Sequence, residues 1–509
     1  MKTALSTTVF FLFTIITSTA QIQLGADIDG LHFRDQCGAE LAISNSGDVF
    51  AVSSYFANTA GYDAGRVRVF NWNGTSWAQR GASLLGDSID DAFGFSVGIN
   101  ANGTLLAVGV PYSEANRNVI TRVKHGEIKV FEWNGSAWNV KGSPIPGAAT
   151  NELFGLEIAI NDAGNRIAAS STGRNSSKDE VRVFDWSGSA WVQVGNTLQG
   201  EANADNFGAS VSFSGSGSIL AVGAPGNKGT TSSTSVGHCR VFTLSGATWT
   251  QIGSDIDGEL IPNLISPYSS ANSGKSVALN ESGNVVLIGA PVNSGNGNAA
   301  GHARVYRWNG TSWIQQGADI DGEAAGDFSG SEVSINAQGN IIAIGARKNG
   351  GTGVDAGHVR IFRWDGTSWL KQGIDIDGEG MFDESGTAVA LDSMGVTVAI
   401  GAPENNNAGG LSGHARVYNL GNLVGVAEMK KESIITSISP NPFDREFIVS
   451  FKQPTKTKVI ARDISGAIVY SNSIEGKSQL TVKLEVGSGI YFVEIGEGAA
   501  KEIHKVIRL

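Results

Sequence analysis

The chain of 509 residues has little cysteine and little positive charge. Its two cysteines, Cys37 and Cys239, exclude the disulfide-rich class of small secreted domains. A net charge of −11 argues against nucleic acid as a partner, because phosphate recognition needs clustered Lys and Arg. After residue 20 the sequence has no apolar run long enough to span a bilayer, so we expect no transmembrane segment. Glycine is abundant, with 68 residues, which is typical of a turn-dense all-β protein.

The first 20 residues read as a secretory signal peptide. Lys2 supplies the positive start, residues 9–16 form a short apolar run, and Ser18-Thr19-Ala20 is a small-residue cleavage site. We therefore expect an exported protein whose mature chain starts near Gln21.

A phrase that ends in glycine recurs along the chain at intervals of 53 to 64 residues. Its clearest copy runs from Val359 to Gly373 and contains two tryptophans. A period of this length, rich in short strands, is typical of a β-propeller with one four-stranded blade per repeat. The closing glycines are Gly25, Gly81, Gly142, Gly195, Gly253, Gly317 and Gly373.

The two ends of the repeat region are incomplete in complementary ways. The segment 21–25 holds only the end of the phrase, and the segment 414–418 holds only its beginning. Joined, they complete one blade and remove the exposed edge of an open ring. The sequence predicts a seven-bladed all-β propeller over residues 21–425, closed by the N-terminal strand.

Each repeat divides into strands A to D, and all eleven tryptophans flank the C–D hairpins. The pairs could form a sugar-stacking platform, but they recur in nearly every repeat, whereas a binding site is usually local. We interpret them as scaffold. Cys37 and Cys239 belong to repeats on opposite sides of the ring, so we expect two buried free thiols.

Strands A and B share a motif, which reads Phe93-Gly94-Phe95-Ser96-Val97 in strand A and ends strand B with Gly-Ala-Pro, as in Gly223-Ala224-Pro225. This pair resembles the FG-GAP repeat of integrin α-subunit propellers and their bacterial relatives. Calcium-binding members carry an Asp-x-Asp-x-Asp-Gly loop between A and B, but here these hairpins are Asn/Gly turns with too few carboxylates. The resemblance therefore implies the fold without those calcium sites.

A second acidic signal lies in the connectors between strand D and the next strand A, where Asp-Ile-Asp-Gly occurs four times. The acids are either solvated turn residues or a weak site for Ca²⁺ or a cationic ligand. The candidate metal residues are Asp319, Asp321, Glu323, Asp375, Asp377 and Glu379. Histidines also recur at the start of strand C, but one per blade should spread them around the ring, so we expect no catalytic or metal role for them.

After about residue 425 the repeat stops, and residues 426–433 read as a linker. Residues 434–509 alternate in polarity and predict a small Ig-like β-sandwich. Four landmarks resemble the C-terminal sorting domain of type IX secretion cargo in the Bacteroidetes: a Pro-Asn-Pro segment, an Asp-Ile-Ser-Gly turn, Gly-Ile-Tyr and a basic-apolar ending. The resemblance implies export through the type IX machinery; the alternative is an appended binding module. The residues that carry it are Pro440, Asn441, Pro442, Gly466, Gly489, Tyr491 and Lys505.

Three functions remain open. The leading hypothesis is a secreted or surface-attached, non-catalytic binding or adhesion protein whose loops contact a glycan or another surface protein. A polysaccharide hydrolase or lyase is the rival, because propellers host both classes. The third is a purely structural envelope protein. An enzyme would gather residues that lie off the repeat at the central opening, and the candidates are Tyr55, Tyr62, Tyr112, Arg117, Arg174 and Tyr268.

Overall fold

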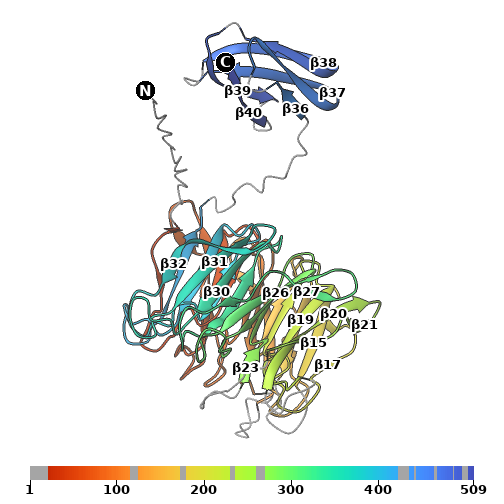
Figure 1. Ribbon diagram of the computed structural model, residues 1–509. Helices are drawn as coiled ribbons and strands as arrows, with labels where there is room; N and C mark the ends of the chain where they lie inside the picture. The colour runs from red at the N-terminus through yellow and green to blue at the C-terminus, as the bar shows by residue number, and fades with distance from the viewer. Residues whose placement is uncertain are drawn as a thin grey trace. The chain divides into compact units, whose positions relative to one another are not determined.

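A computed structural model describes residues 21–114, 124–171, 179–229, 235–259, 270–421, 435–440, 443–463, 467–484, 486–495 and 502–508. The predicted signal peptide, the linker, Arg117, Arg174 and Tyr268 lie outside these residues. The described chain is all-β, as predicted, and no helix occurs in it. It divides into two compact units, Met1–Leu423 and Val424–Leu509, which are described separately here (Figure 1).

The described strands of the first unit form seven sheets, which are antiparallel except where β23 pairs in parallel with β20, and we number them in chain order by their innermost strands. Sheet 1 contains β3 (Leu41–Ile43), β4 (Val49–Ser54), β5 (Arg66–Trp72), β6 (Trp77–Gln79) and β7 (Leu84–Leu85). Sheet 2 contains β8 (Val97–Ile99), β9 (Leu105–Val110), β10 (Glu127–Trp133), β11 (Trp138–Val140) and β12 (Ile145–Pro146). Sheet 3 contains β13 (Ile158–Ile160), β14 (Arg166–Ser171), β15 (Glu180–Trp186), β16 (Trp191–Gln193) and β17 (Leu198–Gln199).

Sheets 4 to 7 repeat this plan. Sheet 4 contains β18 (Ser210–Phe213), β19 (Ile219–Ala224), β20 (Ser235–Ser245), β21 (Thr248–Gln251), β22 (Ile256–Asp257) and β23 (Ser270–Ser273). Sheet 5 contains β24 (Ser276–Leu279), β25 (Val285–Ala290), β26 (His302–Trp308), β27 (Trp313–Gln315) and β28 (Ile320–Asp321). Sheet 6 contains β29 (Ser329–Ile335), β30 (Ile341–Ala346), β31 (His358–Trp364) and β32 (Trp369–Asp377). Sheet 7 contains β33 (Ala388–Leu391), β34 (Thr397–Ala402) and β35 (His414–Asn419), together with β1 (Ile22–Gln23) and β2 (Ile28–Asp29) from the start of the chain.

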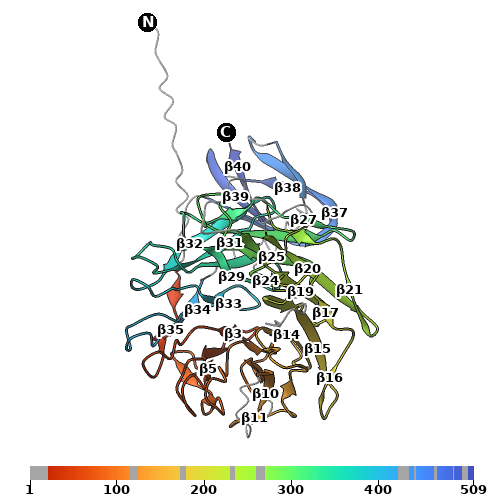
Figure 2. The same cartoon turned by 90° about the horizontal axis from the view of Figure 1, so that it is seen from below.

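The innermost strands contact one another in a closed cycle. Strand β3 lies against β8, and the contacts continue through β13, β18, β24, β29 and β33 back to β3 (Figure 2). Sheet 7 is completed by both ends of the unit, because Ile22 pairs with Asn419 and Ile28 pairs with Ala415. The N-terminal strands thus lie in the last sheet, as the two incomplete copies of the repeat predicted.

The second strand of each sheet is the core of the fold. Every residue of β4, β9, β25, β30 and β34 is buried, as expected for continuous apolar runs covered on both faces. The apolar side chains of neighbouring sheets pack together, as in the cluster that joins Val69 of sheet 1 to Val108 of sheet 2. Cys37 and Cys239 are both buried and free, as predicted.

The tryptophans tie neighbouring sheets together. Where the hairpin between the third and fourth strands of a sheet has two tryptophans, the one that ends the third strand pairs with the one that begins the fourth. In sheet 2 these are Trp133 and Trp138. The indole N–H of the second tryptophan then donates to a backbone carbonyl of the preceding sheet; for Trp369 the acceptor is the oxygen of Gln316, at 2.8 Å. This repeated bond supports the scaffold interpretation.

The second unit is one hydrogen-bonded sheet of β36 (Ile435–Ser439), β37 (Glu446–Arg462), β38 (Ile468–Lys483), β39 (Gly489–Ile495) and β40 (Glu502–Arg508). Its core contains Phe443, Phe447, Val459 and Val493, all fully or almost fully buried. The long strands β37 and β38 pair over most of their length. The Ig-like sandwich remains a prediction.

Candidate functional site

A central cavity of about 430 Å³ lies inside the closed cycle of innermost strands. Each of the seven sheets contributes at least one residue of its lining, mostly from the segment that leads into the innermost strand. The lining residues are Ala39, Glu40, Tyr55, Phe95, Leu156, Glu157, Gly208, Ala209, Lys275, Ser331, Glu332, Arg347 and Thr387.

Three of these residues are glutamates from different sheets. Burial raises the pKa of Glu157 to about 8 and that of Glu332 to about 7, and it raises the pKa of Glu40 well above its usual range. The like charge of Glu332 raises the pKa of both other glutamates further, whereas Lys275 lowers all three. The glutamates are therefore close enough to influence one another's ionisation, and Glu157 is mainly protonated at neutral pH.

One part of the wall is aromatic. The rings of Tyr55 and Phe95 are 5.2 Å apart, and Phe95 makes an edge contact with Tyr112 at 6.0 Å. Burial and the nearby Glu40 raise the pKa of Tyr55 to about 12, so its hydroxyl stays protonated. Of the residues that the sequence indicated as candidates for an enzyme site, Tyr55 lines the cavity. Tyr112 does not line it but contacts the ring of Phe95, which does. The Tyr62 hydroxyl instead accepts a hydrogen bond from Arg34 at an exposed position.

Sequence reasoning missed the three glutamates. They occupy the same place in strand A, three residues after the Phe, Cys or Ser that opens the motif, and that place is Ser96, Ser210 and Ser276 in other repeats. The available signal was the replacement of a small residue by glutamate at Glu40, Glu157 and Glu332. Only the ring places these positions around one cavity.

The acidic Asp-Ile-Asp-Gly segments are not the loops that we expected. Their isoleucine is buried and pairs with strand C, so that the segment forms a short strand; in sheet 5, Ile320 pairs with Ala303. Asp321 lies in β28, Asp375 and Asp377 lie in β32, and Asp319 directly precedes β28. The cause is the alternation in the segment: the apolar residue fills the core while both aspartates face away from it.

The structure brings all six predicted acids close to histidines, and four of them belong to compact clusters. Four clusters, each of one Asp, one Glu and one His with ligand atoms within 4.8 Å of one another, occur among the described residues. In each, the His and Asp belong to one sheet and the Glu follows the last strand of the preceding sheet, so we call them the junction clusters. They are Glu201–His238–Asp255, Glu259–His302–Asp319, Glu323–His358–Asp375 and Glu379–His414–Asp27. Asp321 and Asp377 are outside these clusters and sit opposite His302 and His358 in the strand pairing.

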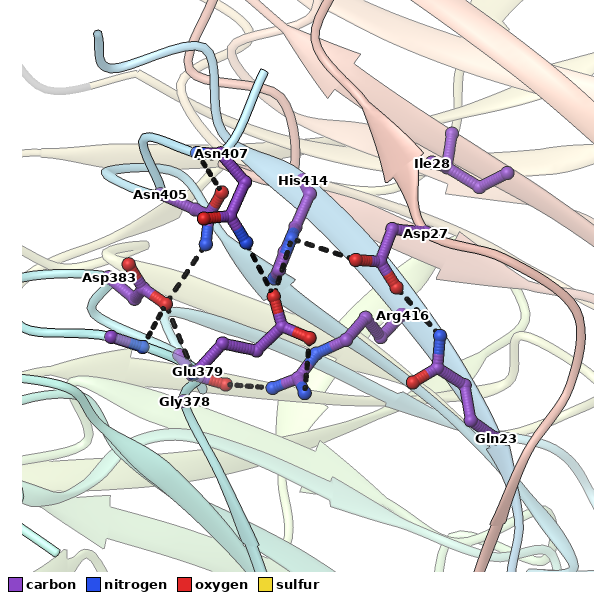
Figure 3. Close-up of polar contacts among 12 residues, drawn as sticks. Gln23, Asp27, Ile28, Gly378, Glu379, Asp383, Asn405, Asn407, His414 and Arg416 are labelled. Carbon is purple, nitrogen blue, oxygen red and sulfur yellow. Dashed lines mark hydrogen bonds and ion pairs between the residues drawn. The ribbon is translucent and has the colours of Figure 1, made fainter. Parts of the chain in front are cut away.

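Figure 3 shows the junction cluster of sheet 7. The Nδ1 atom of His414 lies 3.6 Å from Oδ2 of Asp27 and 3.9 Å from Oε2 of Glu379. His414 is completely buried, and neither ring nitrogen has a hydrogen-bond partner within the described part of the chain. Burial and Arg416 lower the pKa of His414 to about 4, so its imidazole is neutral at pH 7. As expected, the histidines are spread around the ring, one in each of sheets 4 to 7. That each has carboxylates beside it was not foreseen from the sequence.

The sorting residues lie in the second unit. Tyr491 is buried in β39 and its hydroxyl donates to the carbonyl of Gly487 at 2.6 Å. Gly489 begins β39, Pro440 is exposed after β36, and the backbone of Lys505 pairs with Phe492. Asn441, Pro442 and Gly466 lie outside the described residues. The Arg508 side chain donates to the carbonyls of Asp444 and Leu484, which fixes the end of β40 to the start of the unit.

Comparisons with known proteins agree with the C-terminal interpretation. No curated protein matches the chain. A solved structure, described as a candidate 6-phosphogluconolactonase from Bacteroides uniformis, is 11% identical, with a TM-score of 0.46, and the match covers 67% of this chain and 85% of that one. No helix in the described residues is long and apolar enough to cross a membrane. Residues 437–508 match the secretion system C-terminal sorting domain, so this is a protein exported through the type IX system and secreted or attached to the cell surface.

Proposed function

We propose that the exported protein is a glycan-binding protein whose ligand enters the central cavity of a seven-bladed β-propeller. Its blades are the seven sheets, and their A and B strands support the FG-GAP assignment through motifs such as Phe93-Gly94 and Phe154-Gly155. The sorting domain delivers this propeller to the cell exterior, where polysaccharides are accessible.

The observation that carries the proposal is the convergence of Glu40, Glu157 and Glu332 with Lys275 and Tyr55 in one cavity. Ligand sites combine apolar and aromatic walls with a few polar groups that fix orientation. Sugar hydroxyl groups both donate and accept hydrogen bonds, which suits a lining that contains carboxyl, ammonium and phenol groups. The aromatic pair of Tyr55 and Phe95 provides apolar surface for a sugar ring.

A second function, glycoside hydrolysis, is favoured by one feature of the same cavity. A glycosidase needs a carboxylic acid that is still protonated near neutral pH and a second carboxylate beside it. The pKa of about 8 for Glu157 and of about 7 for Glu332 meet that requirement. We rank hydrolysis below binding. Propeller scaffolds host both binding proteins and enzymes, so the fold does not favour an enzyme, and the cavity residues alone do not define a reaction.

The test uses the purified protein on a panel of polysaccharides, with retention and newly released reducing ends read from the same samples. Retention without release supports the binding function, and release identifies a hydrolase. The variant in which Glu40, Glu157 and Glu332 are all glutamine should lose retention at least tenfold. Glu132→Gln, an exposed glutamate paired with Lys141, is the matched control and should bind normally. Retention that the triple variant leaves unchanged would contradict the assignment to this cavity.

A further inference from the structure

We infer that the junction clusters around His238, His302 and His414 are binding sites for a divalent transition-metal ion of the Zn²⁺ type. Each would hold the ion between an imidazole nitrogen and two carboxylates and leave one position for water. This inference is independent of the glycan cavity, because none of these residues lines it.

The three ligand types occur together within the internal repeats. The position of His414 is taken by His in sheets 4 to 7 and by Arg66, Glu127 and Glu180 in sheets 1 to 3. The aspartate position of Asp27 is likewise Asp only in sheets 4 to 7, and it is Ser83, Pro144 and Thr197 in sheets 1 to 3. The glutamate of each cluster directly follows the glycine of the connector from the preceding sheet. In the connectors that lead to sheets 1, 2 and 3, where the His is absent, this position is Leu31, Asp87 and Ala148. A set of residues that is kept or lost as a whole points to a shared partner.

The distances suit a small ion with nitrogen and oxygen ligands. Zn–N and Zn–O bonds of about 2.0–2.2 Å in a tetrahedron put neighbouring ligand atoms about 3.4 Å apart. The Nδ1 atoms of His238, His302 and His414 lie 3.8, 3.5 and 3.6 Å from Oδ2 of their aspartates. Each His–Asp pair is thus within a few tenths of an ångström of this spacing, and the glutamate, whose ligand atom lies within 4.8 Å of the other two, would have to move closer to complete the coordination.

The histidines themselves lack the partner that a buried imidazole needs. Both ring nitrogens of His238, His302 and His414 have no hydrogen-bond partner among the residues that the structure describes. These side chains are no more than 1% exposed, and Nδ1 of His414 points toward Asp27 and Glu379 (Figure 3). Nδ1 of His238 lies within 4.0 Å of Asp255 and Asp257, and Nδ1 of His302 lies within 4.0 Å of Asp319 and Asp321. A buried polar group without a partner destabilises the fold, and a metal bond to the nitrogen lone pair would remove part of this cost.

Neighbouring amides hold the carboxylates in position. The amide groups of Gln23, Gln251 and Gln315 donate to Oδ1 of Asp27, Asp255 and Asp319 at 2.6–2.7 Å, so that Oδ2 is left for the ion. The Asn407 amide donates at 2.8 Å to Oε2 of Glu379, the oxygen nearest His414, and Arg416 lies 3.6 Å from the other oxygen of this carboxylate. Such supporting hydrogen bonds to ligating carboxylates are a general feature of metal sites.

The fourth cluster is a natural control within the chain. At the place of Gln315, sheet 6 has Lys371, whose ammonium lies 2.5 Å from Oδ1 of Asp375 and 3.6 Å from Oε1 of Glu323. This cation already neutralises the two carboxylates and repels a metal ion. We therefore expect the His358 cluster to stay free of metal.

The ligand chemistry separates this ion from Ca²⁺. Calcium prefers six to eight oxygen ligands, and a cluster with one imidazole and two carboxylates offers too few. Imidazole and carboxylate together suit Zn²⁺, with three protein ligands and an open position.

The experiment measures metal content of the whole purified protein after chelation, reloading with Zn²⁺ and removal of excess ion. We expect three ions per chain, one for each cluster without a lysine, and no saturable Ca²⁺ binding in their place. Co²⁺ should load the same sites and give the visible absorption of a tetrahedral complex. His414→Gln should remove one ion, and Lys371→Gln, which restores the glutamine of the other sheets, should add one.

Circular dichroism verifies that each variant is folded before its metal is counted. Loading that stays the same when His238, His302 and His414 are all glutamine would overturn the inference, because the ions would then sit elsewhere. No loading of the native chain, or saturable Ca²⁺ in place of Zn²⁺, would also overturn it. A content that Lys371→Gln leaves unchanged would overturn the role given to the lysine.

Discussion

The indole N–H of Trp138 in sheet 2 donates a 2.8 Å hydrogen bond to the backbone carbonyl of Arg80, at the end of sheet 1. The bond crosses the junction between two sheets, which the ion pair of Lys129 with Asp87 also joins. Replacing Trp138 by Phe keeps most of the ring and removes the bond, so the free energy of unfolding should fall by about 1–2 kcal/mol. Trp138→Ala should cost about 3–5 kcal/mol.

Urea denaturation followed by fluorescence measures both effects. Val140→Thr, at an exposed position in the same strand, is the control and should change the unfolding free energy by less than about 0.5 kcal/mol. Equal effects of the phenylalanine and threonine changes would show that the bond does not stabilise the junction.

The closing glycine of the repeat should be sensitive to a methyl group for two separable reasons. Gly81 has a φ of 82°, and a Cβ there would lie 2.8 Å from the ring of Trp133. Gly74 has a φ of 98°, but a Cβ would meet nothing within 4 Å. Gly74→Ala should therefore cost about 1–2 kcal/mol for its backbone conformation alone, and Gly81→Ala should cost clearly more. Thermal unfolding of the two variants tests this, and similar losses would contradict the steric part.

The cavity glutamates should make the protein less stable as the pH rises. A carboxyl group whose pKa is raised by folding contributes stability that is fully present below its unfolded pKa and lost as the pH rises through the folded value. For Glu157 this window runs from its ordinary value of 4.5 to about 8, and for Glu332 it ends at about 7. The melting temperature should fall across this range, and Glu157→Gln should flatten the fall. A profile that the substitution leaves unchanged would contradict the raised pKa.

Removal of the sorting domain should block export and leave the fold of the first unit intact. Deleting residues 437–508 should leave the protein in the cell and absent from the surface and the medium, because these residues engage the type IX machinery. Immunoblots of cell fractions provide the measurement. A point change at exposed Val140 in the first unit should leave export unchanged. Unaltered secretion of the deleted protein would show that another signal directs export.

Much of the scaffold was readable from the sequence because it repeats. The tryptophan pairs, the buried second strands and the pairing of Ile22 with Asn419 follow from the period and its phase. The strand character of the Asp-Ile-Asp-Gly segment was missed because two aspartates and a glycine resemble a turn, and only the buried contact of Ile320 with the core decides otherwise.

The two candidate sites were harder to predict for a different reason. Glu40, Glu157 and Glu332 are more than a hundred residues apart in sequence, and a ring alone makes them neighbours. His414 and Glu379 come from adjacent repeats, so the sequence indicated Glu379 as a candidate metal residue without its histidine, and only the junction between sheets places the two 3.9 Å apart. Repetition identifies a scaffold, whereas exceptions to it identify a site.

Sheet 7 joins the two ends of the first unit by strand pairing, because β1 and β2 come from its start and β35 from its end. Asp27 comes from the start of the first unit, whereas Glu379 and His414 come from near its end. Their cluster therefore forms only when the ring of sheets is closed. Loop-closure entropy grows slowly with length, and the six intervening sheets bring the ends together as they pack. Removal of β1 and β2 would expose the unpaired edge of β35 to other chains. Because the first strands of the unit pair with its last strand, this edge of β35 is covered, and a neighbouring exported molecule cannot add a strand there.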